Sequence, residues 1–536
     1  MTLIKKILLN LISVCLIALL SLSLASCSGE DTADGITYSG TTVTGAVTTA
    51  EVLTVRDGTT AIASGAFAGC DRLTLLTLPS SVTTVRRGAF DGSALIEEEG
   101  GVLYAAGWAI GTSESFGGGT IVLRDGTVGI AEEAFCGLDT LTSLTVPDSV
   151  KHINSRALFG TNALTDISLP FVGASLDGTY YTHFGYIFGA YSNEKNPSYV
   201  PDSLKHVSIT GSEQLYNDAF AGCNKIESIS LPDSLTAIGK RAFLGCSSLS
   251  GIIIPDSVSV IEDRAFYNCI SLRTAKLPTN DAFTVIPQYM FAYCSSLEGI
   301  TVPPSVGAIR ACAFGKCESL AALEFLGSEP MSQIAQQAFD GCKSLTSLTV
   351  AAEIIGKGAF QYCTRLASVR ADGLVELSDY AFNGCLALES ISLAPTTEHI
   401  GANAFHSCSR LYELALPDSL ISIGENAFYG CDSVSSFKIP DSVRSIGANA
   451  FDSCNVGIFV TRDGIRYVDG WITDALPSIT TAAIPSDVRG ICNDAFADCK
   501  NLSRVVYGGT EEEWLALLDR CRCDRLRAVV DVEYSG

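Results

Sequence analysis

Basic residues are scarce in this sequence of 536 residues, because 35 Lys and Arg face 58 Asp and Glu and the formal net charge is −23. An acidic surface repels phosphate backbones, so we do not expect nucleic acid among the partners. Charged residues make up only 17% of the chain and hydrophobic residues 47%, so the chain is able to bury a core. The composition indicates a folded, acidic protein that binds neither DNA nor RNA.

Histidine is rarer still, and the linear motifs of catalysis are missing. Neither H-E-x-x-H nor another metal-ligand spacing occurs among the five histidines, which are His152, His183, His206, His399 and His406. The sequence also lacks G-x-S-x-G, a Walker A loop, G-x-G-x-x-G and an EF-hand loop. We therefore expect no enzyme activity, no cofactor, and no catalytic or metal-binding residues.

Residues 1–26 have the three parts of an export signal. Lys5 and Lys6 precede an apolar run from Ile7 to Leu24, and small residues lead up to Cys27. An uncleaved membrane anchor is the alternative, because about 18 apolar residues are the lower limit for a membrane span. The Leu-Ala-Ser-Cys sequence that ends at Cys27 resembles the bacterial lipobox, which implies cleavage before Cys27 and lipid attachment to it.

The segment after Cys27 is small and acidic, so residues 27–35 are expected to form a flexible tether. The sequence thus predicts an exported protein that a lipid on Cys27 anchors to the membrane, at the bacterial cell envelope or surface.

An internal repeat dominates the remaining sequence. An Ala-Phe pair recurs mostly every 23 residues, with Met in place of Ala before Phe291. Leu158 takes the place of Phe once, and the other copies contain Phe67, Phe90, Phe135, Phe220, Phe243, Phe266, Phe291, Phe314, Phe339, Phe360, Phe382, Phe405, Phe428, Phe451 and Phe496. Stacked units of this size share one core that no single unit could bury. The repeat predicts a solenoid of about 16 rungs of about 23 residues.

One complete copy, residues 231–254, predicts the structure of a rung. Ile252 and Ile254 alternate with exposed positions as in a β-strand, and a Pro-Asp-Ser turn opens the next copy. Ile238 and Phe243 have the spacing of one short helical or 3-10 turn. We expect a parallel β-ladder on one face and such turns on the other.

This pattern resembles the BspA-like type of leucine-rich repeat, with its consensus x-x-Ala-Phe-x-x-Cys-x-x-Leu-x-x-Ile-x-Leu-Pro-x-Ser-Val. The resemblance covers about residues 50 to 507 and implies an α/β-type repeat solenoid, which we place at residues 36–507. Similar proteins attach to host matrix proteins or neighbouring bacteria. The resemblance therefore implies a non-catalytic, adhesin-like surface protein whose partners are proteins or other cells.

Two alternative functions stay open. The first is a passive spacer or envelope scaffold without a specific ligand, which the long repeat would equally serve. The second is an enzyme whose site is hidden in an insert, because catalysis can occur in a fold without any linear motif.

Cysteine is frequent, and 13 of the 20 cysteines stand three residues after the repeat Phe. Equivalent positions stack in one row, where a buried thiol acts as a small hydrophobic group with a weak donor. Side chains in such a row run parallel, whereas a disulfide needs facing Cβ atoms, so we expect a ladder of free thiols. Cys521 and Cys523 form the only close pair outside the row. This C-x-C is weak evidence for a metal or redox site, and a local bridge or two free thiols are the alternatives.

Three inserts interrupt the period, at about residues 94–130, 169–208 and 455–491. The first and third share alternating segments separated by Gly and polar turns, which predicts β-hairpins. The second is rich in aromatic residues, and Tyr is a favoured anchor at protein interfaces. The candidate binding residues are therefore Tyr180, Tyr181, Phe184, Tyr186 and Tyr191. These aromatic residues could instead form a small core of the insert itself.

The last segment, residues 508–536, is expected to cap the end of the stack. Thr510 and Glu513 have the spacing of a capping box at the start of a helix, and residues 527–534 could form a terminal strand. Exposed solenoid ends need such caps.

Overall fold

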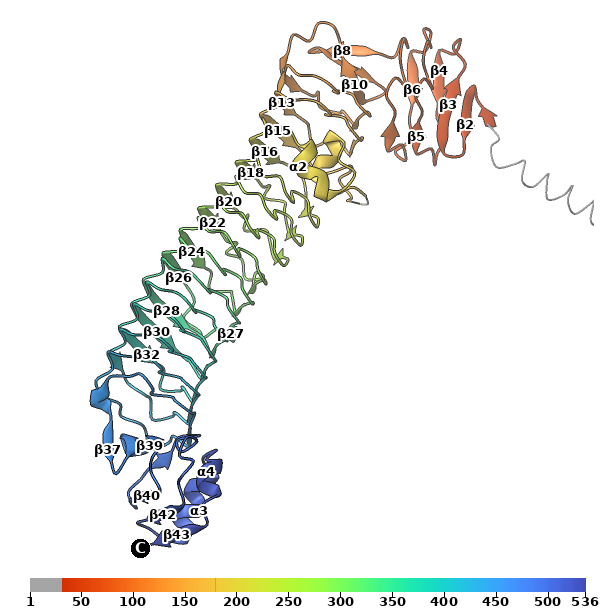
Figure 1. Ribbon diagram of the computed structural model, residues 1–536. Helices are drawn as coiled ribbons and strands as arrows, with labels where there is room; N and C mark the ends of the chain where they lie inside the picture. The colour runs from red at the N-terminus through yellow and green to blue at the C-terminus, as the bar shows by residue number, and fades with distance from the viewer. Residues whose placement is uncertain (1–30, 179) are drawn as a thin grey trace, which may run out of the picture. The chain divides into compact units, whose positions relative to one another are not determined.

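The computed structural model of the chain describes residues 31–178 and 180–536, so the predicted signal segment and Cys27 lie outside the described residues. Two compact units divide the chain, one ending at Gly211 and the other beginning at Ser212. Each unit is a stack of rungs with parallel strands and little helix (Figure 1), which confirms the predicted repeat solenoid.

Most rungs contribute two strands, a two-residue back strand before the repeat Phe and a front strand, usually longer, after it. In the copy around Phe243, the back strand is β19 (Ala237–Ile238) and the front strand is β20 (Gly251–Ile253). Front strand β20 pairs in parallel with β22 (Thr274–Lys276), and Ile253 lies opposite Lys276. Back strand β19 pairs in the same way with β21 (Val260–Ile261). The back ladder is an addition to the single ladder that the sequence predicts.

The first unit contains both kinds of strand. Its front strands are β4 (Val52–Thr54), β6 (Leu75–Thr77), β11 (Gly119–Val122), β13 (Leu141–Thr145), β15 (Asp166–Leu169) and β16 (His206–Ile209). Its back strands are β5 (Ala61–Ile62), β7 (Thr84–Val85), β12 (Gly129–Ile130) and β14 (His152–Ile153). The two kinds enclose a core in which the rings of Phe67 and Phe90 stack 5.5 Å apart.

The second unit is longer and more regular. Besides β20 and β22, its front strands are β18 (Ser228–Ser230), β24 (Gly299–Val302), β26 (Ala322–Phe325), β28 (Ser347–Ala351), β30 (Ser368–Asp372), β32 (Ser390–Leu393), β34 (Glu413–Leu414), β40 (Thr481–Ile484), β42 (Arg504–Tyr507) and β43 (Asp531–Tyr534). Besides β19 and β21, its back strands are β17 (Gln214–Leu215), β23 (Val285–Ile286), β25 (Ala308–Ile309), β27 (Gln333–Ile334), β29 (Ile354–Ile355), β31 (Glu376–Leu377), β33 (His399–Ile400), β35 (Ser422–Ile423), β36 (Ser445–Ile446) and β41 (Gly490–Ile491).

The turn between back and front strand is not helical, in contrast to the helical or 3-10 turn that the apolar spacing predicts. Two residues before the repeat aromatic position, φ is +57° at Arg241 and lies between +51° and +72° in each of the sixteen copies. A left-handed residue interrupts a right-handed helix. Two consecutive turns result, in which Ala242 N donates to Gly239 O at 3.2 Å and Cys246 N donates to Phe243 O at 3.1 Å.

The repeat Phe side chains form a continuous stack in the second unit. From Phe220 to Phe451, neighbouring rings are almost parallel and their centroids are 4.8 to 5.9 Å apart. Paired strands are ~4.8 Å apart, so the rung spacing itself brings the rings into offset stacking distance. The core is therefore one aromatic column with the apolar strand residues around it.

A row of thiols runs beside this column. Cys246 Sγ donates to the carbonyl oxygen of Phe220, one rung earlier, at 3.2 Å. The same contact, at 3.1 to 3.4 Å, is made by Cys269, Cys294, Cys317, Cys342, Cys363, Cys385, Cys408, Cys431 and Cys454. The described cysteines are all free, as expected for thiols that point at a neighbouring backbone rather than at each other.

A three-stranded antiparallel hairpin module occurs three times, where the sequence predicts two hairpins. The modules are β1 (Asp31–Ala33) to β2 (Ile36–Ser39) and β3 (Thr42–Ala46), then β8 (Glu97–Glu99) to β9 (Val102–Ala105) and β10 (Trp108–Thr112), then β37 (Val460–Arg462) to β38 (Ile465–Val468) and β39 (Trp471–Ala475). In every copy the last strand joins a back strand in parallel, which is β5, β12 or β41. In each module, the third strand thus takes the place of the back strand that a preceding rung would supply. A short 3-10 turn, η3 (Val456–Ile458), precedes the third copy.

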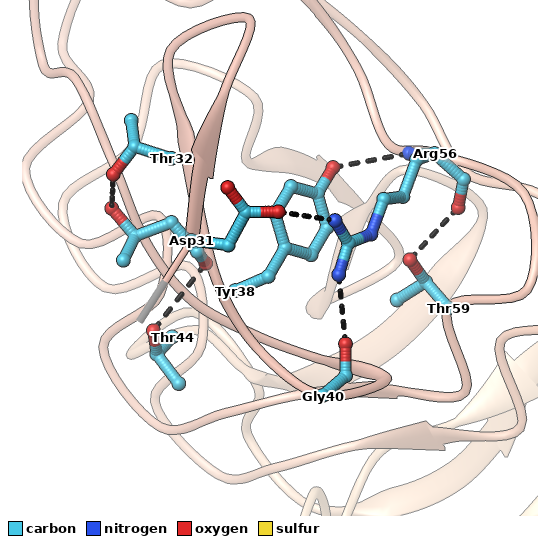
Figure 2. A network of polar contacts seen from close by, with 8 residues as sticks. Asp31, Thr32, Tyr38, Gly40, Thr44, Arg56 and Thr59 are labelled. Carbon is cyan, nitrogen blue, oxygen red and sulfur yellow. Dashed lines mark hydrogen bonds and ion pairs between the residues drawn. The ribbon is translucent and has the colours of Figure 1, made fainter. Parts of the chain in front are cut away.

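The first module is fastened to the first rung by a polar network (Figure 2). Arg56 N donates to the Tyr38 hydroxyl at 3.1 Å, and the Arg56 guanidinium lies 3.9 Å from the centroid of the same ring. Arg56 also pairs with Asp31 at 2.9 Å. The second module repeats the arrangement, because Arg124 N donates to the Tyr104 hydroxyl at 3.2 Å and its guanidinium covers that ring.

This first module includes residues that we expected in a flexible tether. Residues 31–33 form β1, and Asp34 and Gly35, with φ of +50° and +79°, turn the chain back into β2. Two consecutive residues with positive φ are typical of the tight turns that close hairpins. Residues 31–35 of the predicted tether therefore belong to a hairpin, and residues 27–30 lie outside the described residues.

Two short helices and a last strand close the second unit. Helix α3 (Glu511–Asp519) begins with the predicted capping box, in which Thr510 N donates to Glu513 Oε2 at 2.9 Å. After α4 (Asp524–Arg527), strand β43 pairs in parallel with β42. Trp514 on α3 is buried, so the helix covers the last rung.

Candidate binding surface on the insert

The aromatic insert, at about residues 169–208, is a compact set of helical turns rather than a hairpin. It contains η1 (Phe184–Phe188), η2 (Asn193–Lys195) and α2 (Asn196–Tyr199), drawn in yellow in Figure 1. Phe184, Ile187 and Phe188 are buried, and the rings of Phe184 and Phe188 meet edge to face at 5.5 Å. The insert therefore has a small core of its own, the alternative that its aromatic residues left open.

Buried polar contacts fix the backbone of this insert. Asn196 is fully buried, and its Oδ1 accepts a hydrogen bond from Gly185 N at 2.9 Å. His183 Nε2 lies 3.1 Å from the carbonyl oxygen of Ala190, so this nitrogen donates and carries the proton. Burial lowers the pKa of His183, which favours the neutral ring that this contact uses. The surface residues thus stand on a well-anchored segment.

The five candidate aromatic residues separate into three environments. Tyr180, Tyr181 and Tyr191 are exposed, with 72%, 54% and 67% of their surface accessible. Tyr186 is half-buried, and burial raises its pKa. Phe184 belongs to the core of the insert, so it is not available as a surface anchor. We call the three exposed residues the tyrosine patch.

One member of the patch is held by ring stacking. The rings of Tyr181 and Tyr186 are nearly parallel, with centroids 4.8 Å apart, and His183 meets Tyr186 edge-on at 6.3 Å. Tyr181 also has a left-handed backbone with φ of +52°, an uncommon conformation for an aromatic residue. An exposed ring that is already held in place loses little side-chain entropy when a partner covers it.

A cation lies beside another member of the patch. Lys195 Nζ is 5.8 Å from the centroid of the Tyr191 ring, within the range of a cation–π contact. The patch therefore offers aromatic faces, hydroxyl groups and one ammonium group.

Sequence comparison gives the chain a family. The family described as BspA type leucine rich repeat region matches six times, at residues 47–98, 118–182, 213–346, 284–411, 332–457 and 398–511. These segments cover well over half of the chain. The chain belongs to the BspA-type leucine-rich repeat family.

Solved structures with similar folds come from several bacteria. A leucine-rich repeat protein from Bacteroides ovatus is 24% identical, with 77% of this chain and 96% of that chain covered and a TM-score of 0.43. A leucine-rich repeat protein from Eubacterium ventriosum is 18% identical, with 70% and 98% covered and a TM-score of 0.32. The pneumococcal vaccine antigen PcpA is 18% identical, with 82% and 98% covered and a TM-score of 0.39. No curated protein matches.

The front strands of this BspA-type solenoid present few groups that could anchor a partner. The exposed positions of the front ladder in the second unit are mostly small or polar, such as Ser230, Thr301 and Ser392. Ile253 is an exception, with 68% of its surface accessible. Binding hot spots are usually Trp, Tyr or Arg, so the tyrosine patch is the better candidate.

Two histidines each lie against a serine, which bears on the possibility of an enzyme. His406 Nδ1 is 2.9 Å from Oγ of the adjacent Ser407. His399 Nδ1 is 2.9 Å from Ser422 Oγ on the neighbouring rung. A serine nucleophile also needs donors for the oxyanion that forms in the reaction. Around Ser422, the backbone N–H groups of Ser422 and Gly424 already donate to carbonyl oxygens of the preceding rung. These two N–H groups are therefore not free to stabilise an oxyanion at Ser422.

Within residues 31–178 and 180–536, no group of three or more His, Cys, Asp or Glu is placed to hold a metal ion. In the same part of the chain, no helix combines the length and the apolar character that a membrane crossing requires.

The sequence contains a signal for the first hairpin module, which the 23-residue period does not reveal. Asp34-Gly35-x-x-Tyr38 has the same spacing as Asp463-Gly464-x-x-Tyr467 in the third module and Gly101-x-x-Tyr104 in the second. The turn Arg-Asp-Gly-Thr also occurs after both of the first two modules, at residues 56–59 and 124–127. Comparing segments outside the 23-residue period would have found the module.

Proposed function

We propose that the protein is an exported, lipid-anchored surface protein that binds a protein or cell-surface ligand through the tyrosine patch of the insert and performs no catalysis. The observation that carries the proposal is the exposure of Tyr180, Tyr181 and Tyr191 on a segment that departs from the repeat. Membership of a repeat family supports binding as the role of the solenoid, and the patch supplies a place for it.

The tyrosine patch stands on the buried residues of the insert, which we call its frame. The frame, with buried Asn196 and Phe188, does not need to rearrange when a partner binds. Tyrosine gives a large contact area at low entropy cost and retains a hydroxyl for hydrogen bonds. Three exposed tyrosines on one short insert bury too little of their rings to stabilise the unbound chain, so folding alone does not account for them.

The anchor is the second part of the proposal. Lipid attachment at Cys27 is supported by the lipobox-like sequence and the preceding basic and apolar segments. Asp31 already belongs to β1, so three residues separate Cys27 from the first strand. Such a segment spans at most ~10–14 Å, which would hold the first hairpin module close to the membrane.

The binding test compares two sets of tyrosines in a soluble form that begins at Ser28. The patch variant combines Tyr180→Ser, Tyr181→Asn and Tyr191→Ser, with Asn chosen because it tolerates the left-handed backbone. The control variant changes three tyrosines on the repeat with similar exposure, namely Tyr293, Tyr362 and Tyr412, to Ser. Binding is measured against whole bacterial cells, host cells and a panel of extracellular matrix proteins.

We expect saturable binding that the patch variant loses by tenfold or more and that the control variant retains. Equal binding by both variants would refute the patch as the binding site. If the unchanged protein binds nothing in the panel, the passive spacer or envelope scaffold becomes the better explanation. Circular dichroism of each variant establishes that the solenoid is folded.

The anchor is tested separately by Cys27→Ala in the full chain. We expect the wild-type protein to partition with membranes and to carry a lipid on its N-terminal peptide by mass spectrometry, and the variant to lose both. Membrane retention by the variant would instead favour an uncleaved anchor.

A further inference from the structure

The aromatic insert is attached to strand β14 by residues 174–176, which we call the strap. Ile153 N donates to Ala174 O at 2.9 Å, and Leu176 N donates to Lys151 O at 3.3 Å. Strand β14 is the last strand of its sheet, and the strap lies antiparallel along its outer edge. These bonds hold this part of the insert on the solenoid.

The strap also holds one member of the tyrosine patch. Ala174 N donates to Tyr181 O at 3.1 Å, so the residue that bonds to β14 bonds to the patch as well. A Cβ on Gly173 would collide with Tyr181 O, which shows how closely the two segments approach. Displacement of the strap therefore displaces Tyr181.

A histidine stands at each end of this arrangement. His152 on β14 bridges to Ser175 of the strap, and its half-buried ring stacks on the Trp108 ring with centroids 6.3 Å apart. His183 is 7% exposed, and its Nε2 donates to the carbonyl oxygen of Ala190 at 3.1 Å. Both rings are held in places where water cannot fully hydrate a positive charge.

One charged group opposes this effect at His152. Trp108 covers the ring from β10, and Gly129 lies opposite on β12 without a side chain. From the insert, the charge of Asp177 favours the protonated ring. The ammonium group of the adjacent Lys151 bonds to a backbone carbonyl oxygen at 3.0 Å. Burial outweighs Asp177, so the pKa of His152 lies below its ordinary value.

The contacts of the His183 ring are uncharged. It meets the Tyr186 ring edge-on at 6.3 Å and bonds to the Ala190 carbonyl oxygen. Near Tyr186, Arg86 and Glu132 form an ion pair at 2.8 Å, so their charges largely cancel. Burial lowers the pKa of His183, although its hydrogen bond opposes the shift. A proton added to His183 is therefore a buried charge next to neutral groups.

We propose that the strap is a pH-sensitive attachment, which holds the insert on β14 at neutral pH and leaves it in mild acid as His152 and His183 each take up a proton. Water hydrates both rings once the strap has left, so their pKa there is close to the ordinary ~6.5. Below that pH the detached form binds protons that the attached form does not, and attachment weakens as the pH falls. Above it both rings are neutral, and attachment does not depend on pH.

This attachment regulates the tyrosine patch, and its role in binding rests on the proposed function. A displaced strap no longer fixes Tyr181, so a partner has to order this residue at an additional entropic cost. We expect binding through the patch to weaken about fivefold or more between pH 7.5 and pH 5.0.

Amide hydrogen exchange tests the attachment without any ligand. Purified full-length protein is exchanged at pH 7.5 and at pH 5.0, with labelling times scaled for the intrinsic rate at each pH. We expect the protection of the Ile153 and Leu176 amides to fall about fivefold or more in acid. The Gly239 and Glu262 amides, which bond to back strands of the second unit, are expected to keep theirs.

A double variant, His152→Gln with His183→Gln, removes both protonation sites and keeps an N–H donor at each. Gln214 and Gln333 hold the position of His152 on their own back strands, so glutamine fits there. We expect this variant to keep at pH 5.0 the protection that it has at pH 7.5. The control is His399→Gln, because His399 holds the same position on β33, and this variant is expected to lose protection as the wild type does.

Equal protection of the wild-type strap at both pH values would overturn the proposal, and so would a loss in the double variant that equals the wild-type loss. If the double variant is not folded at pH 7.5, an NMR titration of wild-type protein with 15N-labelled histidine decides instead. Values below ~6.5 for His152 and His183 support the proposal, and values at or above it overturn the proposal. Constant exchange together with binding through the patch removes only the pH control, whereas acid-dependent exchange without any ligand removes only the binding role.

Discussion

At the scale of single residues, a conformation rather than a side chain defines the repeat. The position two before the aromatic residue is left-handed in every copy, yet it holds Gly, Asn, Asp, Arg, Glu, Gln, Tyr and Cys. A non-glycine residue there costs about 1–2 kcal/mol of backbone strain. The stacked rungs accept this cost, because the turn it creates places Phe243 and its equivalents in the core. Because the residue at this left-handed position varies in type, the sequence does not reveal it. The spacing of the apolar residues alone predicted a helical turn.

Gly65 allows this strain to be measured alone. It has φ of +72°, and a Cβ built on it meets no atom within 4 Å. We expect Gly65→Ala to lower the free energy of unfolding by about 1 kcal/mol through the backbone conformation alone. Gly117, which has the same free space but no positive φ, is the control. Urea denaturation compares the two, and an equal effect of both alanines would show that the left-handed conformation carries no cost here.

At the scale of elements, the hairpin module shows how a rung can begin without a preceding one. Trp108 on β10 lies opposite Gly129 on β12, and Trp471 on β39 lies opposite Gly490 on β41. In the first module, Thr42 occupies the place of the tryptophan and lies opposite a residue with a small side chain. The tryptophan ring therefore fills the space that a side chain on the opposite glycine would need. Where the tryptophan is replaced by the smaller Thr42, the opposite residue has a side chain.

A double variant tests this coupling. A Cβ on Gly129 would lie 2.5 Å from the Trp108 ring, so we expect Gly129→Ala to destabilise the protein by about 1–3 kcal/mol. Combining it with Trp108→Thr, which copies the first module, is expected to cost less than the sum of the two single changes by at least ~0.5 kcal/mol. Thermal or urea denaturation of all four proteins gives the coupling energy. Strict additivity would mean that ring and backbone do not compete for this space.

The sequence predicted the strands of the repeat, because their residues recur at a regular spacing. A 23-residue spacing determines the parallel register, since Gly251 and Thr274 pair at that separation. The candidate site was predictable only as a region. Aromatic enrichment marks the insert, but whether Phe184 enters the core and Tyr181 stays outside depends on packing within the insert. Tertiary contacts of that kind leave no regular trace in a single sequence.

At the scale of the whole molecule, the thiol ladder links stability to pH. Burial raises the pKa of ladder thiols, to about 12 for Cys454 and further for others such as Cys317 and Cys342. In the unfolded chain the same thiols titrate near ~8.5. Above that pH the unfolded state loses protons that the folded state keeps, so the ladder favours unfolding as the pH rises. Below it, both states are protonated and the ladder adds no pH dependence.

We therefore expect the free energy of unfolding to be nearly constant from pH 7 to 8 and to fall steeply between pH 9 and 10.5. Each ladder thiol contributes a slope of up to about 1.4 kcal/mol per pH unit. Replacing Cys317 and Cys342 by Ala lowers stability at pH 7, because two buried donors are lost, yet it makes the alkaline slope shallower by up to about 2.7 kcal/mol per pH unit. Leu345→Ala, a buried change without a titrating group, is the control and keeps the wild-type slope. Urea denaturation across this pH range distinguishes the two, and an unchanged slope in the double cysteine variant would place the alkaline instability in the acidic surface rather than in the core.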